Sequence, residues 1–244
     1  MDATREKVMV RALATGMLCL FAGRLYAQPV PITGATCVST GTVVVTTTIR
    51  ITSGTYDGGC RTYIPGQGMD INSHSEDTVA KSVLFRLENG AQLRNVIIAP
   101  APWLASAKAI NVYAGATLEN INITKVFGEV AISAKTPGTV NIRGITSVDS
   151  ADRHIHALGA NTTIKISNCI FRNARKVYRQ NGGTTYPTIV SIDRCDISGM
   201  TDEVFRTDSP LASAALTNSR LHDVRAICTG YAAGKCITSG NAIY

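Results

Sequence analysis

Basic residues recur through the chain at positions that are related to one another by a common spacing. Lys108, Arg153 and Lys176 each stand two residues before an apolar or aromatic position, and His156, Arg179 and Arg206 each stand one residue after such a position. Clustered ammonium and guanidinium groups attract anionic ligands and stabilise negative charge that develops during a reaction. The spacing therefore predicts a cationic site, provided that the fold brings these positions together.

The elements that would bring these positions together are short repeats. Six similar segments of alternating apolar and polar residues begin at Leu93, Leu118, Ile142, Ile166, Ile192 and Leu216. A second set of apolar positions recurs in parallel at Phe85, Ile110, Ile132, Ile155, Tyr178, Phe205 and Ile227. Alternation is typical of β-strands, and a fixed period of about 24 residues with short strands indicates a solenoid. We expect an all-β, single-domain, right-handed parallel β-helix of about seven to eight coils.

Stacked coils place equivalent residues one strand spacing apart, about 4.8 Å. Arg153 and Lys176 then lie on neighbouring coils. Strict alternation would point both side chains into the core beside Ile155 and Tyr178, where an unpaired charge is very costly. We therefore expect a bend just before the strand, so that Arg153 and Lys176 face outward.

Polar residues and cysteines also align between coils. Asn95 and Asn120 occupy equivalent positions, so their side chains should stack and hydrogen-bond in a ladder. Cys169 and Cys195 share a column on adjacent coils, and we expect them to form a disulfide. Cys228 with Cys236 would close a local loop, and Cys37 with Cys60 follows by elimination, although sequence alone does not fix the connectivity.

The N-terminus has the features of a targeting segment. Residues 1–27 combine a basic start, a short apolar stretch and a small residue at Ala27, which is typical of a secretory signal, and 28–244 would be the folded domain. The alternative, an anchor helix, needs about 20 apolar residues. Removing 1–27 lowers the net charge from +7 to +5. We expect a secreted monomer with an acidic polymer as its partner, and neither nucleic acid nor membrane.

Several segments carry a resemblance to a known family. They are Thr55–Tyr63, Leu84–Ile98 (LFRLENGAQLRNVII), Gly128-Glu129, Ala151–Arg153 and Lys176–Arg179 (KVYR). The chain resembles the compact pectate lyases, polysaccharide lyase family three, over about residues 40–230. The resemblance implies a parallel β-helix that cleaves polygalacturonate, the pectin backbone, by β-elimination.

The resemblance also implies roles for individual residues. It places Arg153 at a catalytic lysine position, and Lys176 and Arg179 at the lysine and arginine of the KVYR segment. It points to Arg179 as the base, although an arginine has a pKa above about 12. Neighbouring cations lower the pKa of a lysine, so Lys176 is a second candidate for the base. The sequence does not decide between Lys176 and Arg179. Lys108, His156 and Arg206 would bind substrate.

The expected calcium site departs from the family pattern. Family members bind Ca²⁺ through acidic residues, but Lys108 and Val130 stand where two aspartates are expected, and only Glu129 remains. Calcium prefers several oxygen ligands, which usually include carboxylates. In one interpretation Lys108 supplies the positive charge in place of calcium. In another, catalysis is lost and a uronate-binding β-helix remains; a polygalacturonase ranks last because the aligned columns are basic.

Overall fold

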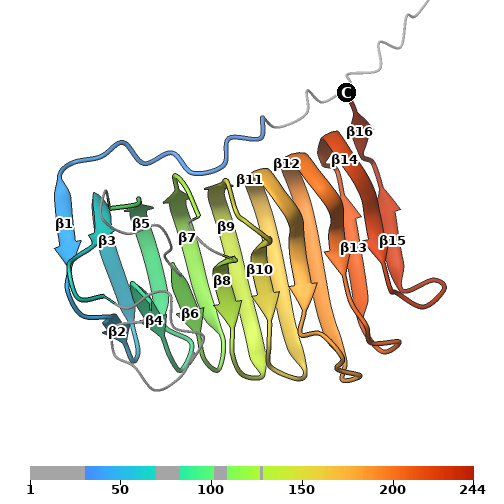
Figure 1. Ribbon diagram of the computed structural model, residues 1–244, viewed down its shortest axis with the longest axis horizontal. Helices are drawn as coiled ribbons and strands as arrows, with labels where there is room; N and C mark the ends of the chain where they lie inside the picture. Colours follow the sequence, from blue (N-terminus) through green and yellow to red (C-terminus); the bar gives the residue numbers. More distant parts are fainter. Residues whose placement is uncertain (1–30, 70–82, 102–108, 127–128) are drawn as a thin grey trace, which may run out of the picture. The chain divides into compact units, whose positions relative to one another are not determined.

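The computed structural model describes residues 31–69, 83–101, 109–126 and 129–244. Ile32–Tyr244 form one compact unit in which every paired strand runs parallel to its neighbours. The unit is a right-handed parallel β-helix of about eight turns, which confirms the predicted fold class (Figure 1). Across the described ranges, no helix is long and apolar enough to cross a membrane.

The strands stack in two series along the solenoid. One series contains β1 (Thr42–Val45), β3 (Thr55–Pro65), β5 (Gln92–Ile98), β7 (Ala116–Ile123), β9 (Gly138–Val148), the first parts of β11 (Thr162–Gln180) and β12 (Thr188–Arg206), then β13 (Ser213–Thr217) and β15 (Cys236–Ser239). The other contains β2 (Ile49–Ile51), β4 (Phe85–Leu87), β6 (Ile110–Val112), β8 (Val130–Ala134), β10 (Arg153–Ala157), the last parts of β11 and β12, and β14 (Arg220–Thr229); β16 (Ala242–Ile243) pairs with β14.

The apolar positions of the second series stack in register through the core. Consecutive strands align Phe85, Ile110, Ile132, Ile155, Tyr178 and Phe205, all of which are buried. The next aligned residue is Cys228, not the predicted Ile227. The step from Phe205 to its partner is therefore one residue longer than the step to Ile227 that the sequence predicted. The β12–β14 pairing also shifts register between Met200 and Glu203.

The corners of the coils use a left-handed backbone conformation. The third residues of the six repeats all have positive φ: Asn95, Asn120, Gly144, Asn168, Arg194 and Asn218. Asparagine tolerates this conformation better than most residues. The predicted ladder is present, because Asn120 Nδ2 donates to Asn95 Oδ1 at 2.9 Å. Asn95 Nδ2 in turn donates to Asp57 Oδ1 at 3.1 Å.

The segment before the first coil lies along this row of corners. The backbone N–H of Thr36 donates to Asn120 Oδ1 at 2.7 Å, and that of Thr33 donates to Asn168 Oδ1 at 3.1 Å. Between them, Ala35 N–H donates to Thr146 Oγ1 at 3.0 Å. The asparagine side chains therefore satisfy backbone groups of the leading segment as well as each other.

Three disulfides join neighbouring parts of the solenoid, as predicted. Cys169 and Cys195 pair across adjacent coils with Cα atoms 4.5 Å apart. Cys37–Cys60 and Cys228–Cys236 have Cα separations of 5.2 Å and 6.5 Å. The first bridge lies in the coil stack that also carries the basic residues, and so ties together the strands that position them.

Candidate active site

Two aligned columns of the second strand series carry most of the predicted site. The first column contains Val130, Arg153, Lys176 and Glu203 on β8, β10, β11 and β12. The second contains Ser133, His156, Arg179 and Arg206 on the same strands. The structure therefore brings five of the predicted residues together on three adjacent coils. Of the other two predicted residues, Lys108 lies outside the described residues and Glu129 stands just before β8.

A bend follows Arg153 and Lys176. His154 and Ile155 are consecutive and both buried, as are Val177 and Tyr178. Two successive inward residues break the alternation, and the β11–β12 pairing is irregular between Ala174 and Lys176. The side chains of Arg153 and Lys176 consequently avoid the apolar interior, although they retain only 15% and 10% exposure.

The bend also turns His154 inward. His154 packs on Phe171 with ring centroids 5.0 Å apart, and its Nδ1 lies 2.8 Å from Ser147 Oγ. Burial lowers the pKa of His154 to about 3. His154 is therefore a neutral core residue, while His156 stays in the column with Arg179.

Lys176 lies between two carboxylates. Its Nζ donates to Asp152 Oδ1 at 3.0 Å and to Asp202 Oδ2 at 3.1 Å. Arg175 also pairs with Asp202, at 2.8 Å. Burial raises the pKa of Asp202, but the hydrogen bond and charge of Lys176, together with Arg175, outweigh burial and hold this pKa below its usual value. Lys176 is therefore a charged donor that Asp152 and Asp202 share.

Arg153 continues the same network on the preceding coil. Its Nη1 lies 3.0 Å from Asp152 Oδ2, and its Nη2 lies 3.4 Å from Glu129 Oε2. Asp152 thus bridges Arg153 and Lys176, which are paired in register. This shared carboxylate holds the two cations close to each other, because each forms an ion pair with it.

Arg179 is held by a separate carboxylate. Its Nη1 and Nη2 donate to Asp208 Oδ1 and Oδ2 at 3.1 and 2.7 Å, a two-pronged arrangement. The backbone N–H of Gly183 donates to Asp208 Oδ2 at 2.9 Å. The hydrogen bond from Arg179, followed by that from Gly183, holds the pKa of Asp208 below its usual value. Arg206 approaches Asp208 more distantly, at 3.9 Å.

Asp208 should therefore stabilise the fold in a pH-dependent way. Because its folded-state pKa is lowered, its contribution is present above the unfolded pKa of about 3.9 and is lost as the pH falls through the folded value. We expect Asp208→Asn to lower the free energy of unfolding by about 1 kcal/mol at neutral pH and by almost nothing in strong acid. Urea unfolding of both proteins across this pH range measures the difference.

The matched control for this prediction is Asp223→Asn. Asp223 carries no ion pair among the described contacts, so its replacement should change stability little at either pH. A destabilisation by Asp208→Asn that is equal at neutral and acidic pH would contradict the assigned role of the Arg179–Asp208 pair.

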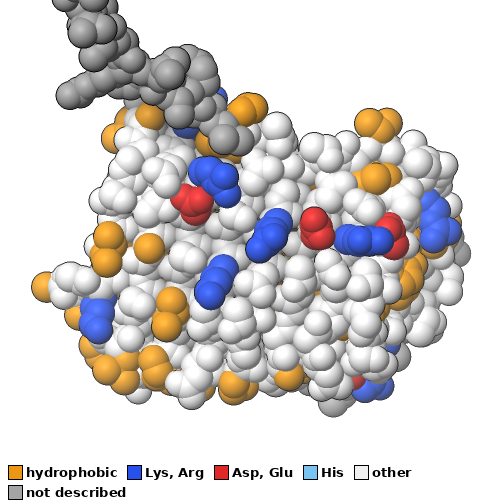
Figure 2. Space-filling model, turned by 180° about the vertical axis from the view of Figure 1, so that it is seen from behind, with side chains coloured by type: hydrophobic (Ala, Val, Ile, Leu, Met, Phe, Trp, Pro, Cys, Tyr) orange, Lys and Arg blue, Asp and Glu red, His pale blue; other side chains and the backbone are white. Residues whose placement is uncertain are grey.

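The site is therefore charge-balanced rather than simply basic. The sequence interpretation treated the columns as basic, but Arg153, Lys176 and Arg179 each form an ion pair with a carboxylate. On the face drawn in Figure 2, basic and acidic side chains likewise lie next to one another. Sequence reasoning missed Asp202, Glu203 and Asp208. Glu203 was detectable, because it stands two residues before Phe205 and pairs in register with Lys176.

The carboxylates around the site do not fit a calcium ion. Each nearby carboxylate already forms an ion pair. Glu129 pairs with Arg153, Asp202 pairs with Lys176, and Asp152 pairs with both. Val130, at one expected ligand position, is buried and apolar. Across the described ranges, no group of three or more His, Cys, Asp or Glu side chains could hold a metal. A calcium ion here would have to displace cations that are already in place.

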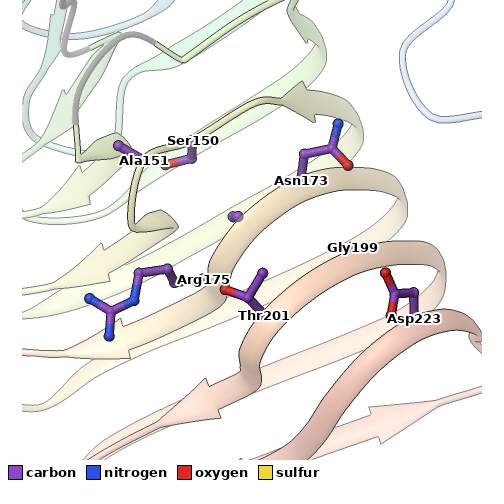
Figure 3. Close-up of a pocket in the computed structure, with 8 residues that line it drawn as sticks. Ser150, Ala151, Asn173, Arg175, Gly199, Thr201 and Asp223 are labelled. Atoms are coloured by element: carbon purple, nitrogen blue, oxygen red, sulfur yellow. The ribbon is translucent and has the colours of Figure 1, made fainter.

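An open pocket of about 390 Å³ lies at the corner beside this network. Asn173, Gly199 and Asp223 line it from three successive coils, and Arg175, which pairs with Asp202, stands at its edge (Figure 3). Asn173 Nδ2 donates to Asp149 Oδ1 at 2.8 Å, so Asp149 supports the corner. The pocket lining combines polar side chains with Ala151, Ala174 and Gly199, and the pocket adjoins the ion pairs.

Comparison with known proteins decides the family. The pectate lyase family model matches residues 33–236, which is most of the chain. The chain belongs to the pectate lyase family. It is 28% identical over 200 residues to Pectate lyase H of Emericella nidulans, a match that covers 76% of this chain and 71% of that protein.

A solved pectate lyase shares the fold. The catalytic domain of pectate lyase PelI from Erwinia chrysanthemi superposes with a TM-score of 0.59 at 16% identity, covering 83% of this chain and 99% of that domain. This likeness supports the β-helical architecture of the family. The family is generally associated with calcium, which the carboxylates described above do not fit.

Proposed function

We propose that the protein is a secreted pectate lyase that cleaves polygalacturonate by β-elimination. The observation that carries the proposal is the alignment of Arg153, Lys176 and Arg179 on adjacent coils of a pectate lyase-family β-helix. Secretion rests on residues 1–27, which lie outside the described residues, and on three disulfides, which are typical of exported proteins.

The reaction requires three tasks from the side chains. The uronate carboxylate must be neutralised, so that the adjacent C5–H becomes acidic. A base then takes this proton, and the C5–H electrons form the C4–C5 double bond while the C4–O bond breaks. The glycosidic oxygen leaves with the electrons of that bond and acquires a proton. Cations serve the first task and stabilise the enolate-like charge, and a positioned base serves the second.

The geometry suits Arg153 and Lys176 to the neutralising task. Both side chains are mostly buried but keep 15% and 10% exposure, and Asp152 holds them together. A substrate carboxylate that docks there would add to a network in which the cations are already oriented, so little reorganisation is needed during the reaction.

Arg179 is the residue that we assign to proton abstraction. Its guanidinium is oriented by two hydrogen bonds to Asp208, whereas Lys176 donates to two carboxylates at once. The position of Lys176 between two carboxylates suits it to holding the site together, and the family resemblance points to Arg179 as the base. His156 and Arg206, which flank Arg179 in its column, would contact substrate.

We further propose that this lyase works without calcium. Glu129, the surviving acidic ligand of the family pattern, pairs with Arg153, and Val130 offers no oxygen. Arg153 and Lys176 can pair directly with the uronate carboxylate and neutralise its charge, as calcium would. Lys108, which stands at the other altered position of the sequence pattern, would contribute in the same way.

Two alternative functions would give different results with polygalacturonate. A catalytically degenerate β-helix would bind polygalacturonate without cleaving it. A polygalacturonase would use carboxylates to hydrolyse the glycosidic bond. The site does contain carboxylates, so it is not only basic, as the sequence had indicated. These carboxylates are engaged in ion pairs, however, and the family assignment favours the lyase.

Incubation of the protein with polygalacturonate tests the proposal. Elimination yields an unsaturated terminal uronate that absorbs ultraviolet light, whereas hydrolysis adds water and gives no such absorbance. A rise in absorbance supports the lyase. New reducing ends without absorbance would establish hydrolysis, and binding without any cleavage would establish the degenerate binder.

A further inference from the structure

The column that contains Arg179 runs well beyond the candidate active site. Strand pairing aligns Arg50, Arg86, Asn111, Ser133, His156, Arg179 and Arg206 in one register across successive coils. Arg86 is four coils from Arg179, which corresponds to about 19 Å at about 4.8 Å per coil. The column therefore has a cationic group at each end, separated by Asn111 and Ser133, which are buried.

The distal cationic group is built around one carboxylate. Arg50 Nε and Nη2 donate to the two oxygens of Glu88 at 2.9 and 2.8 Å. Arg86 Nε donates to the same carboxylate, at Oε1. The hydrogen bond from Arg50, opposed by burial and assisted by Arg86, holds the pKa of Glu88 below its usual value. Two guanidiniums thus share one anion, which leaves the cluster with a net positive charge.

Both guanidiniums retain capacity for a ligand. An arginine side chain has five N–H donors, and the contacts with Glu88 use two on Arg50 and one on Arg86. The side chains are 59% and 31% exposed. Arg86 also stacks on the ring of Tyr113, with the guanidinium carbon 4.1 Å from the ring centroid. This contact fixes the guanidinium plane, which reduces the entropy lost when it binds a carboxylate.

We propose that Arg50 and Arg86 form a distal subsite that binds a second uronate carboxylate of the same polymer. The proposal rests on the proposed function, because it takes the ligand of the active site to be a polyuronate. The shared column directs the polymer along the solenoid. Because Asn111 and Ser133 are buried, contact is made chiefly at the two cationic ends, and only a long chain reaches both.

The experiment compares polymer and short oligomer as ligands. Dissociation constants for polygalacturonate and digalacturonate are measured by calorimetry on the full chain, for wild type, Arg50→Gln, Arg86→Gln and the double variant. Each single variant should weaken polymer binding by about tenfold, the factor for about 1.4 kcal/mol, and leave digalacturonate binding unchanged. Arg94→Gln is the matched control, because Arg94 is a 46% exposed arginine that pairs with Asp57 on the other strand series.

The outcomes separate this proposal from the proposed function. Unchanged polymer affinity in the double variant would show that Arg50, Glu88 and Arg86 form only a structural ion cluster, and the proposal would be wrong. Equal losses for polymer and digalacturonate would also contradict a separate subsite. If wild type binds neither ligand, the polyuronate function itself fails. Urea unfolding of each variant identifies any loss caused by misfolding.

Discussion

Arg179→Ala is expected to reduce elimination on polygalacturonate by at least about 10³-fold, the scale of a lost general base combined with lost charge stabilisation. Arg179 is oriented by two hydrogen bonds from its guanidinium to Asp208 and contributes little to the core. The fold should therefore survive. The rate of unsaturated product formation measures the activity, and circular dichroism measures the fold.

Two further variants sharpen this result. Arg179→Lys keeps a positive charge but cannot form the two-pronged contact with Asp208, so it should recover only a small part of the activity. Arg94→Ala, which removes an exposed and ion-paired arginine on the other strand series, should leave the rate unchanged. A fully active Arg179→Ala protein would place the base elsewhere.

Lys176→Met should lower activity by at least about 10²-fold and also lower stability. Its Nζ holds Asp152 and Asp202 at 3.0 and 3.1 Å, so the variant leaves two carboxylates with a lost partner. We expect a loss of about 1–3 kcal/mol in the free energy of unfolding, the usual cost of an unsatisfied polar group. Product formation is assayed well below the unfolding midpoint, which is determined in urea.

Arg153→Ala is the companion variant for the same network. Arg153 shares Asp152 with Lys176, so its removal should also cost at least about 10²-fold in activity. Because Asp152 keeps its contact with Lys176, the loss of stability should be smaller than for Lys176→Met. Full activity in the Arg153, Lys176 and Arg179 variants would move the active site away from these coils.

The repeat made the columns of the site predictable from sequence. A period in the apolar residues fixes which side chains stack, and it placed Arg153 beside Lys176 and His156 beside Arg179, as the strand pairing shows. The same logic placed Cys169 opposite Cys195. In the last coil the step from Phe205 is one residue longer than predicted, so the period assigned Ile227 where the strand pairing places Cys228.

The ion-pair partners were harder to predict. Asp208 follows β12, outside the repeated positions, and its carboxylate accepts hydrogen bonds from both Arg179 and the Gly183 N–H. Asp202 precedes Glu203, at the register shift itself. Contacts of this kind depend on local turns and side-chain rotamers, which a period in apolar residues does not specify.

The most direct test of the account measures wild-type cleavage of polygalacturonate with calcium and with excess chelator. We predict that unsaturated product forms at a similar rate in both, because Arg153 and Lys176 neutralise the substrate and the nearby carboxylates are engaged in ion pairs. Loss of activity in chelator that is restored by added calcium would contradict it.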